Sequence, residues 1–139
     1  MKQNFLVWFG CVALMVAVAA CATTNNEKAK KEAEVARRLG EAYLQQGNFA
    51  GALKEFKKAE KKYPDDHLLQ YDLGLLYALK ERYDEAIVHY KRALELSPTY
   101  GAAMNSLANA YAGKKDWDQA IFYYRKVIND ILYATPHFA

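Results

Sequence analysis

Side chains suited to catalysis are few in this chain and lie far apart in the sequence. The three histidines, His67, His89 and His137, fall on different predicted helices. The sequence contains no His-x-x-x-His or Cys-x-x-Cys pair and no glycine-rich phosphate loop, which are the usual short signals of metal and phosphate sites. We therefore expect no metal, no cofactor and no enzymatic activity.

The neighbouring carboxylates are better explained as helix caps than as general acids. Asp65 and Asp66 follow Pro64 directly before a predicted helix, where a carboxylate accepts hydrogen bonds from free backbone amides. Asp116 and Asp118 flank the junction between a predicted turn and the next helix. Neither pair predicts acid–base chemistry.

Cys21 is the one nucleophile whose sequence context predicts covalent modification. Lys2 and an apolar run over residues 5–18 precede the sequence Val-Ala-Ala-Cys, which is the pattern of a secretory signal peptide over residues 1–20. Its end resembles a bacterial lipobox, and the resemblance implies cleavage before Cys21 and acylation of that residue by fatty acids such as palmitate. The alternative is an uncleaved membrane anchor, for which residues 5–22 are barely long enough.

Removal of the signal peptide also removes Cys11, so Cys21 would be the only cysteine left and no internal disulfide could form. Two or three acyl chains hold a protein on a membrane, since each buried methylene contributes about 0.8 kcal/mol. Ala22 follows the cysteine. In the sorting rule of such lipoproteins an aspartate at this position prevents export to the outer membrane, so the resemblance implies that this chain is exported there. Residues 21–32 would then be the acylated cysteine, a short tether and a helix start, with the rest facing the periplasm.

The charge balance argues against nucleic acid as a partner. The whole chain of 139 residues has a formal charge of only +3, whereas nucleic-acid binding proteins carry strongly basic surfaces. One predicted helix face does gather lysines, which are Lys54, Lys57, Lys58, Lys61 and Lys62. We expect this to be a solvated convex face, and the alternative is contact with anionic lipid headgroups.

The elements that must position any site repeat with a period of 34 residues. The positions in register are Leu39, Leu73 and Leu107; Gly40, Gly74 and Ala108; Tyr43, Tyr77 and Tyr111; Ala52, Ala86 and Ala120; Phe49, Tyr83 and Trp117; and Phe56, Tyr90 and Tyr124. This pattern resembles the tetratricopeptide repeat, a helix-turn-helix unit of that length. The resemblance implies an all-α chain with three units, at residues 33–66, 67–100 and 101–134, wound into a right-handed superhelix.

Small residues within each unit are expected to set the distance between its two helices. Gly74 and Ala86 would let the helix axes approach, while Tyr77, Tyr83 and Tyr90 fill the remaining space. Most of the 11 tyrosines fall on such packing positions. We therefore interpret them as core residues rather than as a ligand site.

The end of the sequence predicts the start of a fourth repeat at residues 135–139. Thr135 followed by Pro136 is a favourable helix start. The preceding residues Ile131, Leu132 and Tyr133 are apolar, and a repeat stack needs a polar outer face on its last helix. We expect a chain of this length to self-associate through that end.

A binding surface remains as the candidate functional site. In this architecture the first helix of each unit lines a groove, and the side chains opposite the contacts within the unit face it. We predict a partner-binding groove formed by Leu68, Tyr71, Asp72, Leu75, Leu79, Asn105 and Asn109. The alternative for Leu75 and Leu79 is that each packs against a neighbouring helix.

The predicted groove favours an apolar or amide-rich peptide segment. Repeat proteins of the chaperone-cofactor type bind a terminal carboxylate with Lys, Asn and Arg at set groove positions. Here the corresponding positions include Glu41 and Asp72 beside Arg37. The two acids would repel a carboxylate, so that mode of binding is not expected.

The lipobox, the leading repeats and a Leu-Tyr-x-x-Pro sequence at residues 132–136 resemble the type IV pilus biogenesis lipoproteins, or pilotins. That resemblance implies an irregular insert after the third unit. It also implies that the groove binds subunits of a pilus secretin and that the lipid brings them to the outer membrane. The alternatives are a general envelope scaffold that gathers cell-wall enzymes, and the non-catalytic N-terminal part of a longer protein.

Overall fold

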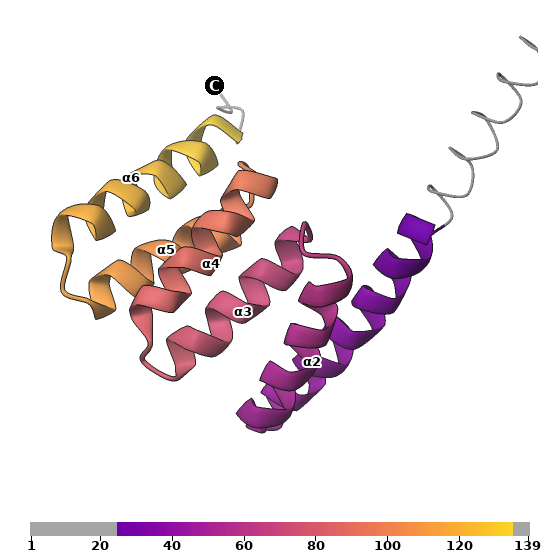
Figure 1. Ribbon diagram of the computed structural model, residues 1–139. Helices are drawn as coiled ribbons and strands as arrows, with labels where there is room; N and C mark the ends of the chain where they lie inside the picture. The colour runs from indigo at the N-terminus through magenta and orange to yellow at the C-terminus, as the bar shows by residue number, and fades with distance from the viewer. Residues whose placement is uncertain (1–24, 135–139) are drawn as a thin grey trace, which may run out of the picture.

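The computed structural model describes residues 25–134, and the regular structure in this range is entirely helical. A first helix covers residues 25–45 and is called the N-terminal helix below. The helices that follow are α2 (Phe49–Lys62), α3 (His67–Leu79), α4 (Tyr83–Leu96), α5 (Gly101–Gly113) and α6 (Trp117–Ala134). Figure 1 shows successive antiparallel pairs of helices placed side by side in one array. The all-α fold expected from the sequence is confirmed.

The same turn joins the two helices of each pair, although the residue at its centre differs. Gly47, Glu81 and Lys115 occupy equivalent positions and have φ values of 73°, 57° and 64°. In each turn the backbone N–H of the next residue bonds to the carbonyl of a tyrosine five residues before it. These bonds join Asn48 to Tyr43 at 2.8 Å, Arg82 to Tyr77 at 2.9 Å and Asp116 to Tyr111 at 2.9 Å. A left-handed residue followed by such a bond is a Schellman helix ending.

Two of the four predicted capping carboxylates are confirmed as helix caps. Asp66 accepts a hydrogen bond of 2.9 Å from the backbone N–H two residues later. Asp116 accepts one of 3.3 Å from the N–H three residues later. Asp65 instead pairs with Arg92 across 2.7 Å, and Asp118 lies exposed in the first turn of α6.

Close approach of the paired helices depends on glycine. A Cβ atom added to Gly74 would lie 2.6 Å from the ring of Tyr90, and one added to Gly40 would lie 2.5 Å from the ring of Phe56. Both rings are almost completely buried. The largest fully buried side chains are Tyr90, Phe56, Leu69, Leu73, Met104 and Leu107. The predicted role of the small residues and of most tyrosines in the core is therefore confirmed for the described residues.

Equivalent positions of the repeat are not equally buried. Leu39 is 43 % exposed, whereas Leu73 and Leu107 are 0 % exposed, because no unit precedes the N-terminal helix among the described residues. The helix α6 continues to Ala134, so the irregular insert expected after the third unit lies outside the described residues. Leu132 stands at the position of Pro64 and Pro98, so nothing ends the helix there.

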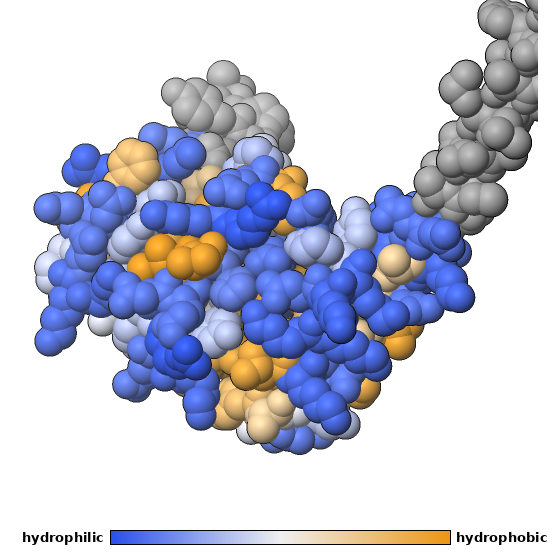
Figure 2. Space-filling view, in the orientation of Figure 1, coloured by the Kyte–Doolittle hydropathy of each residue, from blue (hydrophilic) through white to orange (hydrophobic). Residues whose placement is uncertain are grey.

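The predicted signal peptide, Cys21 and the start of a fourth repeat at residues 135–139 lie outside the described residues. Between residues 25 and 134, no helix combines the length and the apolar character needed to cross a membrane. The face of the molecule in Figure 2 is mostly hydrophilic and carries separated apolar patches.

Candidate functional site: a groove along the first helix of each pair

The predicted groove residues lie on two neighbouring helices, α3 and α5, which contact each other directly. Leu68, Tyr71, Leu75 and Leu79 recur at intervals of three or four residues and so share one face of α3. Asn105 and Asn109 are one turn apart on α5. These positions follow from helix geometry once the two helices are in place.

The structure brings Leu75 and Asn109 together in one pocket of about 150 Å³. Its lining also includes Ser106 of α5 and the rings of Tyr83 and Tyr90 from α4. Most of this surface is apolar, with an amide and a hydroxyl at one side. The Tyr124 hydroxyl donates a hydrogen bond of 2.5 Å to the Asn109 side-chain oxygen, which fixes the amide at the edge of the pocket.

Tyr71 belongs to an aromatic cluster that joins α3 to the start of α5. Its ring centroid lies 5.8 Å from that of Tyr90 and 5.3 Å from that of Tyr100. Tyr100 also meets His67 edge to face at 5.3 Å. Sequence reasoning missed Tyr100, because it stands at the residue before α5, where a capping side chain is expected. It makes no capping hydrogen bond, and its ring packs beside Tyr71 instead.

Asp72 occupies a buried ion cluster rather than an open groove wall. Its carboxylate lies 3.0 Å from the Arg37 guanidinium, and the two residues are 6 % and 8 % exposed. Arg37 also contacts Glu41 at 2.6 Å and Asp66 at 3.7 Å. One cation thus faces three carboxylates, and the pair between Arg37 and Asp72 ties the first unit to the second.

Burial raises the pKa of Asp72 from its ordinary value of 3.8 to about 7, against the lowering effect of the Arg37 hydrogen bond. The negative charge of Glu41 adds to the increase in pKa. Removing a carboxylate from water disfavours its ionised form even when a cation is close. Asp72 is therefore a structural residue beneath the groove with an unusual titration.

The other predicted groove residues differ in how much of each side chain faces solvent. Leu68 is partly buried in the first turn of α3, whereas Leu79, its last residue, is 54 % exposed. Asn105 is exposed on α5. The exposed Leu79 side chain offers an apolar contact and the exposed Asn105 side chain a polar one.

The histidines that the structure describes take part in packing. The Nδ1 atom of His89 donates to the Gln70 side-chain oxygen at 2.7 Å, and its ring stacks on Tyr77 at 5.3 Å. Burial disfavours the charged ring and lowers the pKa of His89. Among residues 25–134 no group of three or more His, Cys, Asp or Glu side chains is placed to hold a metal ion.

The five lysines of α2 are exposed, as expected for a solvated face. Three of them pair with nearby carboxylates, namely Lys57 with Glu60 at 2.8 Å, Lys58 with Glu55 at 3.5 Å and Lys62 with Glu32. These pairs reduce the positive charge that the helix presents to a partner.

The identical turns, the glycine-to-aromatic contacts and the paired helices all recur at the same interval. Two family models described as tetratricopeptide repeat match the chain, one at residues 37–101 and the other at residues 77–131. The chain belongs to the tetratricopeptide repeat family. Such repeats indicate a scaffold for protein–protein interaction.

Solved tetratricopeptide structures share this fold. The N-terminal domain of stress-induced protein-1 from C. elegans has a TM-score of 0.68 at 18 % identity, covering 73 % of this chain and 86 % of that one. The first repeat domain of Spaghetti (RPAP3), bound to an HSP90 peptide, gives 0.70 at 20 % identity, with coverages of 73 % and 80 %. MamA gives 0.71 at 26 % identity, covering 74 % of this chain and 60 % of MamA. No curated protein sequence matches the chain.

Proposed function

We propose that this tetratricopeptide chain is a non-catalytic, lipid-anchored scaffold that faces the periplasm from a bacterial outer membrane. Its groove would bind a peptide segment of a partner protein, and the partner class we propose is a pilus secretin. The observation that carries the binding site is the pocket shared by Leu75, Ser106 and Asn109 beside the Tyr71 cluster. Acylation at Cys21 would supply the anchor.

The chemistry of the groove favours an apolar segment with free backbone amides. Leu75, Tyr83 and Tyr90 offer apolar surface, and each Å² buried contributes about 25 cal/mol. Asn105 and Asn109 can bond to the peptide backbone, as in other modes of peptide recognition. The Arg37 cluster does not favour a terminal carboxylate, because its single cation already contacts three carboxylates.

Two solved tetratricopeptide structures support a peptide partner in general. The Spaghetti (RPAP3) domain and the TPR2B domain of yeast Sti1 are described as bound to an HSP90 peptide and in complex with Hsp70. The choice of a secretin rests on the resemblance of the lipobox and of the Leu-Tyr-x-x-Pro sequence at residues 132–136 to the pilotins. A general envelope scaffold for cell-wall enzymes would use the same groove with a different partner.

The site can be tested with two matched substitutions of exposed aliphatic residues by glutamate. Leu79→Glu lies on α3 in the groove, and Val88→Glu lies on α4 outside it, where the native side chains are 54 % and 64 % exposed. We expect Leu79→Glu to weaken binding of the purified secretin at least tenfold, which is about 1.4 kcal/mol. Val88→Glu should leave binding unchanged, and both variants should melt near the wild-type temperature.

If Val88→Glu weakens secretin binding and Leu79→Glu does not, the partner binds the face of α4 that carries Val88. If wild-type protein binds no secretin but retains a cell-wall hydrolase in a way that Leu79→Glu abolishes, the envelope scaffold is the correct function. Leu75→Glu provides a second test inside the pocket, with its folding checked by circular dichroism. Binding that survives in both groove variants would refute the groove as the site.

A further inference from the structure

The repeat provides an internal comparison for the beginning of the stack. Leu69 and Leu73 on α3 are 0 % exposed, and their equivalents on the N-terminal helix, Val35 and Leu39, are 69 % and 43 % exposed. The difference in surroundings is the preceding helix pair, which α3 has and the N-terminal helix lacks among the described residues. Val35 and Leu39 therefore form the half of a repeat interface that packs against a preceding unit.

The other end of the stack carries the complementary half. Ile87 on α4 is 7 % exposed, whereas its equivalent on α6, Ile121, is 49 % exposed. Leu94 is partly buried against the core, and its equivalent Ile128 is 55 % exposed. A third position shows the same contrast, because Trp117 of α6 is 59 % exposed.

The tyrosine that corresponds to Trp117 shows directly what covers this surface inside the chain. Tyr83 lies so close to Gly113 on α5 that a Cβ atom there would be 2.6 Å from the ring. Residues at this position of the second helix thus contact the first helix of the next unit. On α6 the corresponding face has no such helix among the described residues.

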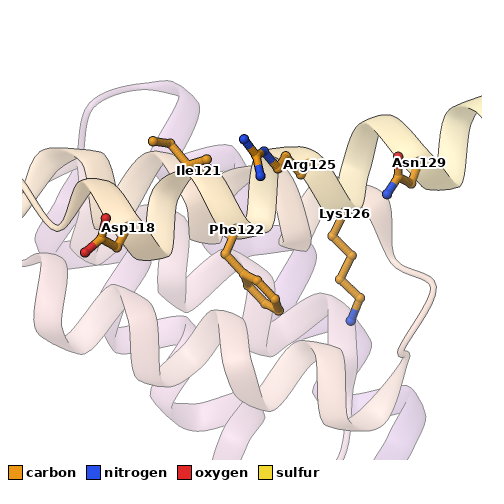
Figure 3. Close-up of a pocket in the computed structure, with 6 residues that line it drawn as sticks. All are labelled: Asp118, Ile121, Phe122, Arg125, Lys126 and Asn129. Atoms are coloured by element: carbon orange, nitrogen blue, oxygen red, sulfur yellow. The ribbon is translucent and has the colours of Figure 1, made fainter.

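The uncovered face of α6 borders an open groove. A groove of about 440 Å³ runs along its outer side, lined by Asp118, Ile121, Phe122, Arg125, Lys126 and Asn129. Figure 3 shows Ile121 and Arg125 projecting from one side of α6 and Phe122 and Lys126 from the other. Of its two apolar residues, Ile121 corresponds to the buried Ile87 and so belongs to the interface, whereas Phe122 corresponds to Val88, which is 64 % exposed on α4.

We propose that the occupant is a second copy of this chain, whose N-terminal helix packs on α6 of the first copy. The contact would continue an interface that the chain already forms twice, between α2 and α3 and between α4 and α5. Each copy carries both halves, Val35 with Leu39 at one end and Ile121 with Ile128 at the other. The assembly is head to tail, and such heterologous contacts give open chains that lengthen with concentration.

This inference is independent of the proposed ligand groove. The groove residues Leu75 and Asn109 lie on α3 and α5, away from both end faces. Stacked copies would place several grooves in one continuous array. A partner with repeated segments would then bind several copies at once and gain affinity through effective concentration.

The experiment uses full-length copies that carry two different tags and are expressed together in the same cells. Val35→Glu removes one half of the interface and Ile121→Glu removes the other. The native side chains are 69 % and 49 % exposed, so each variant should fold. Differently tagged wild-type copies should co-purify. Two copies that both carry Val35→Glu, or that both carry Ile121→Glu, should co-purify at least tenfold less.

The decisive arm combines one copy with Val35→Glu and one copy with Ile121→Glu. Each retains the half that the other has lost, so this mixture should recover co-purification and stop at pairs in crosslinked gels. Val88→Glu is the matched control on α4 and should change nothing.

Loss of pairing with Ile121→Glu alone would indicate a symmetric contact between two α6 helices, and pairing unaffected by either variant would indicate another surface. A fourth unit of a longer chain covering α6 would leave the wild-type copies unpaired. Each of these three results would overturn the proposal.

Discussion

At the scale of single residues, the contact between Gly74 and Tyr90 sets the distance between paired helices. An alanine Cβ at position 74 would lie 2.6 Å from the ring of Tyr90, which is 1 % exposed. We expect Gly74→Ala to lower the free energy of unfolding by about 1 to 3 kcal/mol, the usual cost of overpacking a core. Thermal and urea melts would measure it.

Gly101 supplies a control for the same chemical change. It begins α5, and a Cβ atom there would meet nothing within 4 Å. Gly101→Ala should therefore leave stability unchanged or increase it by a few tenths of a kcal/mol, about what the lower unfolded-state entropy contributes. Equal losses in the two variants would show that helix distance is not controlled at Gly74.

A second residue-scale prediction concerns Asp72, whose raised pKa makes stability depend on pH. The folded protein keeps the proton on Asp72 up to a pH of about 7, whereas the unfolded chain loses it near the ordinary value of 3.8. Because the folded state binds more protons within this window, the contribution of Asp72 to stability falls as pH rises through it. Asp72→Asn cannot titrate, so its stability relative to wild type should increase by about 1.4 kcal/mol per pH unit there.

Urea denaturation of both proteins at pH 4, 5, 6, 7 and 8 measures this difference directly. Subtracting the wild-type curve from the Asp72→Asn curve cancels groups that titrate identically in both. The difference should level off above pH 7. A difference that stays constant from pH 4 to pH 8 would mean that Asp72 is ionised throughout and is fully stabilised by Arg37.

At the scale of elements, sequence reasoning succeeded where the signal was local and repeated. Leucines, tyrosines and small residues at a fixed interval determine which faces are buried, so helices, pairs and core could be predicted. The central residues of the turns were harder to predict from the sequence, because Glu81 and Lys115 adopt positive φ although neither residue type favours turns. Only the equivalent Gly47 carries the usual signal.

The candidate groove was predictable only where helix periodicity alone decides the outcome. Leu75 and Asn109 meet because both lie on the groove-facing sides of adjacent first helices. The burial of Asp72 depends on Arg37, which lies 35 residues earlier on another helix, and no pattern within α3 indicates that contact. The role of Tyr100 could not be predicted either, because it also depends on a contact with another helix: its ring packs on Tyr71 of α3.

At the scale of the whole molecule, the array formed by residues 25–134 is open at both ends while its interior interfaces are closed. The chain forms two complete interfaces between units and leaves half of one at each end, at Val35 and Leu39 and at Ile121 and Ile128. Burial in a repeat array depends on neighbours, so the same leucine position is core in one unit and surface in another. The period that defines the fold therefore also identifies which end surfaces have no neighbouring unit among the described residues.

The last prediction concerns where this array is held in the cell. If Cys21 is acylated, each methylene of its fatty acids contributes about 0.8 kcal/mol to membrane binding, and the repeats remain tethered a few residues away. Cys21→Ala removes the acyl acceptor, so we expect the protein to move from the membrane fraction to the soluble periplasmic fraction. Intact-mass measurement of wild-type protein should show a chain that begins at residue 21 with added acyl mass. A membrane-bound chain that still carries Met1 would show instead that residues 5–22 act as an uncleaved anchor.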